Sequence, residues 1–196
     1  MLPTKDKKTD PMILMERAKS GDNDAYGELY EQYFTPIFRF ILPKVSMRDT
    51  AEDLTQVVFI KVFESLKNFK NMGHSPLSYF FTVARNTVFD FYKKKKDLVI
   101  GENSGDDEMP NIFEKLADEN PNPLESIEIS EKKKSIISMI GSLEGSQKEV
   151  VYLKFIEDLS NPEIARILDK SEDAVRQIQS RALRKLKVLF TEKELI

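Results

Sequence analysis

The chain has 196 residues, of which 40% are apolar and 32% charged, and its formal net charge is −3. This apolar share is enough for a hydrophobic core, and no run approaches the ~20 apolar residues of a membrane span. The absence of cysteine excludes disulfides and cysteine-ligated zinc within the chain, and a single histidine, His74, argues against histidine-rich metal sites and catalytic triads. The first residues lack the apolar core of a signal peptide, so we expect a cytoplasmic protein without membrane insertion.

The charges are unevenly distributed along the chain. Residues 1–96 and 132–196 carry net charges of +4 and +3, whereas residues 97–131 hold one basic and 11 acidic residues. That acidic stretch also contains several glycines and prolines and has no helical periodicity, which is typical of a flexible linker. We therefore expect two mildly basic lobes joined by an acidic linker at 97–130, after a disordered N-terminus at 1–9.

Four helices are predicted in the first lobe, over residues 10–96. Asp10-Pro11 begins the first and Gly21 ends it, because proline fits the first turn of a helix and glycine the position after its last turn. Pro36 should kink the second helix. The apolar spacing places the other three at about 24–44, 50–69 and 75–96.

The second lobe, residues 131–196, is also predicted to be helical, which makes the whole chain all-α. A helix is expected over about 123–142, and Ser146 to Glu149 has the form of a capping box that opens another. Ser160 to Glu163 is a second capping box, and it begins a short helix with a proline in its first turn.

A turn at residues 169–171 and a longer second helix complete the pattern of a helix-turn-helix. Apolar residues recur at helical spacing on one side of the second helix: Val175, Ile178, Ala182, Leu186 and Leu189. Residues 170–189 carry six basic and two acidic side chains, whereas a merely solvated face would mix the signs more evenly. These features together indicate a helix that enters the DNA major groove.

Three segments, in this order, resemble the extracytoplasmic-function sigma factors of bacterial RNA polymerase. They are residues 51–63, residues 79–96, and the stretch from Lys148 through the helix-turn-helix to Leu186. The resemblance implies two helical domains, called regions 2 and 4, that bind core polymerase, recognise promoter elements and help to open the duplex. It implies a protein that is not an enzyme and that needs no cofactor or metal.

The resemblance also implies a docking site for the polymerase. In the family, region 2 binds the clamp helices of the largest subunit, and region 4 binds the flap. The helix predicted at 50–69 is apolar nearly all the way round, so it must be covered on most sides. We expect most of its apolar residues to be core, and the polar contacts to core polymerase to be Glu52, Asp53, Gln56 and Lys61.

In the family, the fourth helix of region 2 and the loop before it bind the −10 element and hold a flipped base. Aromatic, amide and cationic side chains suit melted strands, which expose base faces and edges. The expected contacts are Asn71, His74, Tyr79, Arg85, Asn86, Tyr92, Lys93 and Lys94. An exposed loop position explains His74 equally well, and a solvated helix end explains Lys93–Lys96. Apolar residues at helical spacing, Phe81, Ala84, Val88 and Phe91, are expected to be core instead.

Region 4 of the family reads the −35 element with its recognition helix. The residues expected to reach base edges are Glu172, Asp173, Arg176 and Gln177, since arginine pairs with guanine and glutamine with adenine. Further along the helix, Arg181, Arg184 and Lys185 are better placed for phosphates. The family often has an anti-sigma factor that covers the same surfaces.

Two other classes of protein compete with this interpretation. A free-standing helix-turn-helix repressor or activator would need a dimer face and palindromic half-sites, and it leaves the acidic linker unexplained. A metal-dependent phosphohydrolase would use carboxylates such as Glu52, Asp53 and Asp90. Such a site needs several convergent carboxylates, and capping or interface positions explain these three better.

Overall fold

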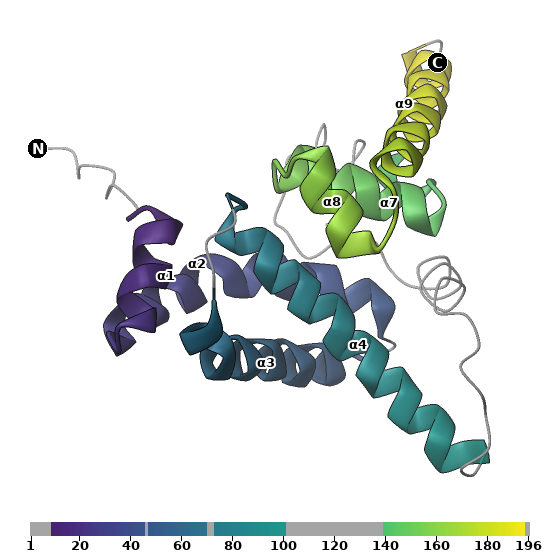
Figure 1. The fold of residues 1–196 in the computed structure, drawn as a ribbon. Helices are drawn as coiled ribbons and strands as arrows, with labels where there is room; N and C mark the ends of the chain where they lie inside the picture. The colour runs from purple at the N-terminus through teal and green to yellow at the C-terminus, as the bar shows by residue number, and fades with distance from the viewer. Residues whose placement is uncertain (1–8, 46, 70–72, 101–138, 195–196) are drawn as a thin grey trace, which may run out of the picture.

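The computed structural model describes residues 9–45, 47–69, 73–100 and 139–194. For residues 96–100 and 192–194 it describes the backbone but not the side chains. Every regular element in these ranges is helical (Figure 1). The predicted linker and most of the helix predicted at 123–142 lie outside them. The part of the chain that is described contains no helix of the length and apolarity that a bilayer crossing requires.

The N-terminal lobe consists of helices α1 to α4. Their bounds are α1 Pro11–Lys19, α2 Asn23–Ile41, α3 Arg48–Ser65 and α4 Pro76–Ile100, with 3₁₀ turns η1 at Leu42–Lys44 and η2 at Leu66–Asn68. Helices α2, α3 and α4 pack on one another around a core rich in aromatic rings, and α1 lies against α2 (Figure 1). The order of helices agrees with the prediction, and α4 runs past its predicted end at residue 96.

Local signals account for where the first two helices begin. Asp10 caps α1 by accepting a hydrogen bond from the amide of Met12 at 2.8 Å, and Asp22 caps α2 through the amide of Ala25 at 3.1 Å. Gly21, between the two helices, has φ +98°, a left-handed conformation in which a side chain would be strained. The short connection therefore reverses the chain and sets α1 against α2.

The C-terminal lobe consists of α7 Gly145–Val151, a π-helical turn η3 at Tyr152–Ile156, α8 Asn161–Leu168 and α9 Glu172–Glu194. Helices α7 and α8 both pack on the first half of α9, and the second half of α9 projects away from the molecule (Figure 1). The capping box predicted at Ser146 to Glu149 was wrong. Helix α7 starts two residues earlier, with Glu144 at the N-cap position instead of Ser146, and Glu149 pairs with a lysine of the other lobe instead of capping its own helix.

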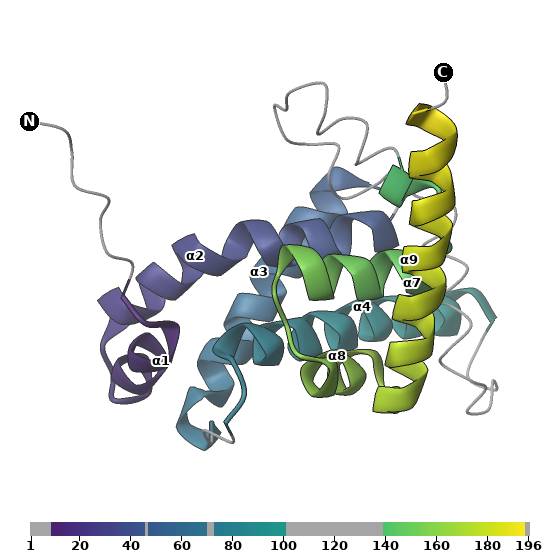
Figure 2. The ribbon, with the colours of Figure 1, turned by 90° about the horizontal axis from the view of Figure 1, so that it is seen from above.

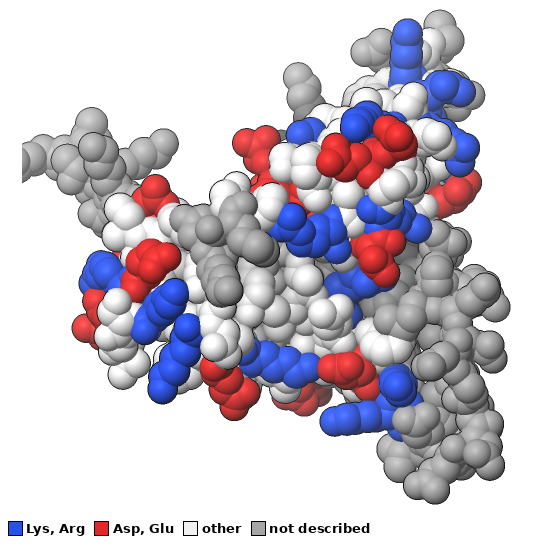
Figure 3. All heavy atoms as spheres, viewed as in Figure 1, with Lys and Arg blue, Asp and Glu red and all other residues white. Residues whose placement is uncertain are grey.

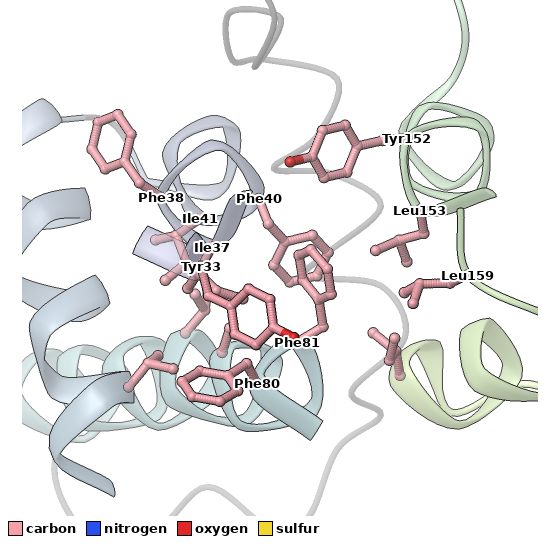
Figure 4. Packing of buried hydrophobic residues seen from close by; sticks show 14 of the residues in the cluster. Tyr33, Ile37, Phe38, Phe40, Ile41, Phe80, Phe81, Tyr152, Leu153 and Leu159 are labelled. Carbon is pink, nitrogen blue, oxygen red and sulfur yellow. The ribbon is translucent and has the colours of Figure 1, made fainter. Parts of the chain in front are cut away.

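The two lobes pack against each other through apolar side chains. Helix α8 lies beside α4, as both ribbon views show (Figures 1 and 2). Tyr152, Leu153 and Leu159 point from the C-terminal lobe toward Phe40 and Phe81 (Figure 4), and all five are buried. The rings of Phe81 and Tyr152 meet edge to face at 6.4 Å. The buried residues of both lobes consequently form one continuous hydrophobic cluster.

Candidate nucleic-acid and protein interfaces

The helix-turn-helix has the predicted local geometry. Glu163 accepts a hydrogen bond from the amide of Ser160 at 2.8 Å, which completes the capping box of α8. Asp169 ends α8 in a left-handed conformation, with φ 52° and ψ 51°. Ser171 then caps α9 by accepting a hydrogen bond from the amide of Ala174 at 3.2 Å. The chain thus turns between the two helices within three residues.

Helix α9 is held by one face and free on the other. Val175 and Ala182 are fully buried, and Ile178 and Leu186 are partly buried against the same core. All seven residues predicted for the −35 element are exposed: Glu172, Asp173, Arg176, Gln177, Arg181, Arg184 and Lys185. Basic side chains are displayed along α9 at the upper right of Figure 3. The apolar face of α9 that the sequence predicts is therefore the face that packs against the core.

Two acidic neighbours hold the guanidinium of Arg176. It lies 3.1 Å from the carboxylate of Glu172 and 3.8 Å from that of Asp173, at i+4 and i+3 spacing along α9. All three side chains are largely solvent-exposed, so these pairs add little to stability. Their effect is to orient the arginine at the N-terminal end of the helix, where base edges would be reached.

A cavity of about 310 Å³ lies between the start of α4 and the end of α3. Tyr79 forms one wall: its ring lies 5.5 Å from that of Phe69, and its hydroxyl is 2.7 Å from the hydroxyl of Ser65. The lining combines aromatic, hydroxyl, amide and cationic groups, and Arg166 of the C-terminal lobe contributes to it. The residues around it are Ser65, Asn68, Phe69, His74, Ser75, Ser78, Tyr79, Thr82 and Arg166.

Most of the other residues predicted for the −10 element lie along α4. Asn86, Lys93 and Lys94 are exposed, and Arg85 is half-buried. Tyr92 donates a hydrogen bond from its hydroxyl to the carbonyl of Lys44 at 2.7 Å, and burial raises the pKa of this tyrosine. Asn71 and the side chain of Lys96 lie outside the described residues. As predicted, Phe81, Ala84 and Val88 are core, whereas Phe91 is only partly buried.

His74 contacts the C-terminal lobe. Its Nε2 lies 2.7 Å from the guanidinium of Arg166, so the ring nitrogen accepts from the arginine when the imidazole is neutral. The sequence left two interpretations of His74 open, a solvent-exposed loop residue and a contact to the −10 element. The fold instead gives this residue a protein partner from the other lobe.

Helix α3 presents an uncovered apolar patch. Val57, Ile60 and Phe63 are 36%, 57% and 48% exposed, while Leu54, Val58 and Val62 on the other side are buried. The expectation that most apolar residues of this helix are core is confirmed, since Phe59 and Leu66 are buried as well. Large apolar side chains that are exposed together mark a protein interaction site more often than a random surface.

Two of the four polar residues of α3 that were predicted to contact core polymerase form ion pairs within the chain. Glu52 pairs with Arg48 at 2.9 Å, and Lys61 pairs with Asp90 of α4 at 2.8 Å. Asp53 and Gln56 are exposed beside the apolar patch. The carboxylates named for a phosphohydrolase do not converge, since Glu52 and Asp90 pair with different cations, and no cluster of metal-ligating side chains occurs in the ranges that the structure describes.

Sequence reasoning missed a charged pair between the lobes. Lys44 is only 2% exposed, and its Nζ lies 2.7 Å from the carboxylate of Glu149 and 2.9 Å from the carbonyl of Phe40. Burial lowers the pKa of Lys44, and Glu149 opposes that shift. One signal could have found this residue: Lys44 is the lone charge within the apolar run from Phe40 to Val45.

Comparison with protein families gives two matches that agree with the two lobes. The model for sigma-70 region 2 matches residues 29–97, and that for sigma-70 region 4 matches residues 139–188. The chain is 32% identical over 184 residues to BldN of Streptomyces coelicolor, an extracytoplasmic-function sigma factor. The chain belongs to the extracytoplasmic-function group of the sigma-70 family.

The extent of the match differs between relatives of this sigma factor. The alignment with BldN covers 92% of this chain but 66% of BldN, so the chain spans just under two thirds of that relative. The alignment with SigM of Bacillus subtilis, at 26% identity, covers 83% of this chain and 93% of SigM. Both relatives are named as extracytoplasmic-function sigma factors of RNA polymerase.

A solved structure shares the fold. The sigma factor CnrH, solved in complex with the cytosolic domain of CnrY, superimposes with a TM-score of 0.58 at 21% identity, covering 93% of this chain and 97% of that one. Because the two family models match them, the N-terminal and C-terminal lobes are called region 2 and region 4 below.

Proposed function

We propose that this chain directs bacterial core RNA polymerase to promoters in the cytoplasm, with region 4 reading a −35 element and region 2 reading and helping to melt a −10 element. The observation that carries this proposal is the helix-turn-helix, in which α9 is fixed by its buried face and leaves its charged face free. The division into region 2, linker and region 4 is part of the proposal, with the linker beginning after Ile100.

Reading of the −35 element is assigned to the N-terminal half of α9. Arg176 and Gln177 are exposed near the start of the helix, where a recognition helix reaches base edges in the major groove. Arginine and glutamine suit guanine and adenine respectively. Arg181, Arg184 and Lys185 lie further along the exposed face and would contact phosphates, which position the protein without specifying sequence.

Reading of the −10 element is assigned to the cavity at the start of α4 and the exposed side chains that follow it. A flipped base needs an aromatic face for stacking and polar groups for its edges. The cavity offers the ring of Tyr79, the hydroxyls of Ser78 and Thr82, and the amide of Asn68. Asn86, Lys93 and Lys94 would contact the strand beyond the cavity.

Core polymerase is assigned to the patch on α3. Val57, Ile60 and Phe63 form an exposed apolar centre, and Asp53 and Gln56 lie beside it. An apolar centre with a polar periphery is the usual anatomy of a protein interface. Because the sigma factor RpoE of Bartonella quintana was solved in complex with the anti-sigma factor NepR, we also propose that an anti-sigma factor binds this chain.

Run-off transcription tests the proposal. Core polymerase from a bacterium should initiate at a defined start site on a template selected from random DNA only when the purified chain is added. A free-standing repressor or activator would bind DNA without conferring initiation, so DNA binding without a run-off product from any selected template overturns the proposal.

A further inference from the structure

Lys19 connects the end of α1 to the turn that follows α3. Its Nζ donates a hydrogen bond of 2.8 Å to the carbonyl of Phe69, a residue 50 positions later in the chain. Helix α1 packs on η2, the 3₁₀ turn that ends just before Phe69, and α1 is seen beside the end of α3 in Figure 1. The hydrogen bond therefore links two helical elements of region 2 that the sequence keeps apart.

Phe69 is one wall of the cavity assigned to the −10 element. Its amide donates to the carbonyl of Leu66 at 3.0 Å, and the backbone then turns from helical to extended, with φ −60° and ψ 127° at Phe69. Its ring lies 5.5 Å from that of Tyr79, the other aromatic residue of the lining. The position of this backbone consequently determines where the aromatic wall stands.

The C-terminus of α1 does not depend on Lys19 for capping. A lysine in the last turn of a helix often serves the carbonyl groups of that same turn. In α1 these groups have other partners: the amide of Ser20 donates to the carbonyl of Glu16 at 3.1 Å, and the amides of Gly21 and Asp22 donate to the two carbonyls that follow. The ammonium of Lys19 is directed to a carbonyl of another element instead.

The contact with Phe69 is suited to ordering a backbone locally. The last carbonyl groups of a helical turn have no partner within it, and an ammonium that donates to one of them makes a charge-assisted hydrogen bond. Lys19 is solvent-exposed, so this bond contributes little to global stability. We therefore expect its effect to appear at η2 and the cavity wall, and not in the unfolding of the whole chain.

We propose that Lys19 is a positioning residue for the −10 cavity. Its ammonium holds the carbonyl of Phe69, so that a flipped base meets an aromatic wall that is already in place and does not have to order it on binding. This assignment rests on the proposed function, because it takes the cavity as the site of the flipped base. It adds to that function a residue of α1, which precedes the residues 29–97 matched by the region 2 model.

Amide hydrogen exchange of the free, full-length chain measures the local effect. Lys19→Met keeps the aliphatic stem and removes the donor, and it should speed exchange of the Phe69 amide threefold or more, because that amide is released by local opening. Lys19→Arg retains a cationic donor and should keep exchange slow. Lys67→Met is the matched control, since Lys67 is an exposed lysine of η2 itself, and it should leave exchange at Phe69 unchanged.

Binding to single-stranded DNA measures the consequence for the cavity. The probe is an oligonucleotide with a −10 element selected by the holoenzyme in run-off transcription, and an abasic site replaces each base in turn. With the unmodified chain and core polymerase, one position should show a loss of affinity of about fivefold or more, as expected for a base stacked on an aromatic ring. Lys19→Met should reduce the penalty at that position threefold or more and leave the other positions unchanged, whereas Lys19→Arg should restore it.

Two results would overturn the positioning role. The first is an unchanged rate of exchange at Phe69 in Lys19→Met. The second is an equal loss of affinity at every position in both Lys19→Met and Lys67→Met, which would make Lys19 one phosphate contact among others. The exchange measurement needs neither polymerase nor DNA, so failure of this role and failure of run-off transcription are distinct results.

Discussion

Glu163 accepts a hydrogen bond from the amide of Ser75, a residue that lies 88 positions earlier in the chain. Its other carboxylate oxygen accepts from the amide and the hydroxyl of Ser160, at 2.8 and 2.6 Å. A single side chain thus caps α8 within region 4 and binds the N-terminal end of α4 in region 2. The capping box read from the sequence accounts for one oxygen, and the fold supplies a partner for the other.

Glu163→Ala should destabilise the protein by about 1–2 kcal/mol, the usual cost of a lost helix cap. Glu163→Gln should cost less, because glutamine also serves in a capping box. Urea unfolding followed by circular dichroism measures both. Equal stability of Glu163→Ala and the unmodified chain would contradict a capping role.

The stability of the protein should depend on Glu163 at low pH. Burial alone would raise the pKa of this carboxyl, but hydrogen bonds from Ser160 and Ser75 outweigh it and lower the pKa from 4.5 to about 2. A lowered pKa in the folded state means that the ionised group stabilises the protein above pH 4.5, and that this contribution is lost as the pH falls toward 2. The stability difference between the unmodified chain and Glu163→Gln should therefore shrink over that interval in urea titrations. A constant difference from pH 7 to pH 2 would rule out the pKa shift.

Arg176→Ala should alter promoter preference at one base pair of the −35 element by about 1–3 kcal/mol. Competition between templates that differ at single positions measures this change. Arg184→Ala is the comparison. Because Arg184 is assigned to a phosphate, its removal should weaken binding to all templates alike. A uniform loss for Arg176→Ala would reassign this arginine to the DNA backbone.

Ile60→Glu should reduce the affinity for core polymerase at least tenfold while leaving the fold intact, because Ile60 is 57% exposed at the centre of the patch on α3. Ile13→Glu is a matched control, since Ile13 is 55% exposed on α1, outside that patch. Anisotropy titration of the labelled chain with core enzyme gives both affinities. Equal affinities for the two variants would place the docking surface elsewhere.

Local sequence determined most of the helices and the helix-turn-helix. Asp10, Gly21 and Ser171 act on residues within a few positions, and the apolar stripe of α9 repeats every three or four residues. Capping and periodicity are short-range effects, so a single sequence is enough to read them. The exposed face of α9 followed directly from the position of its buried one.

Only the tertiary structure decided which residues of the two lobes contact one another and which apolar side chains remain exposed. The pair between Lys44 and Glu149 joins residues more than a hundred positions apart, and no local pattern specifies it. No local pattern specifies the hydrogen bond between Arg166 and His74 either. Nor does one specify the exposure of Val57 and Ile60, which α2 and α4 leave uncovered. Short-range signals fix how each helix begins and which side is apolar, whereas partners across a fold depend on how all the helices pack at once.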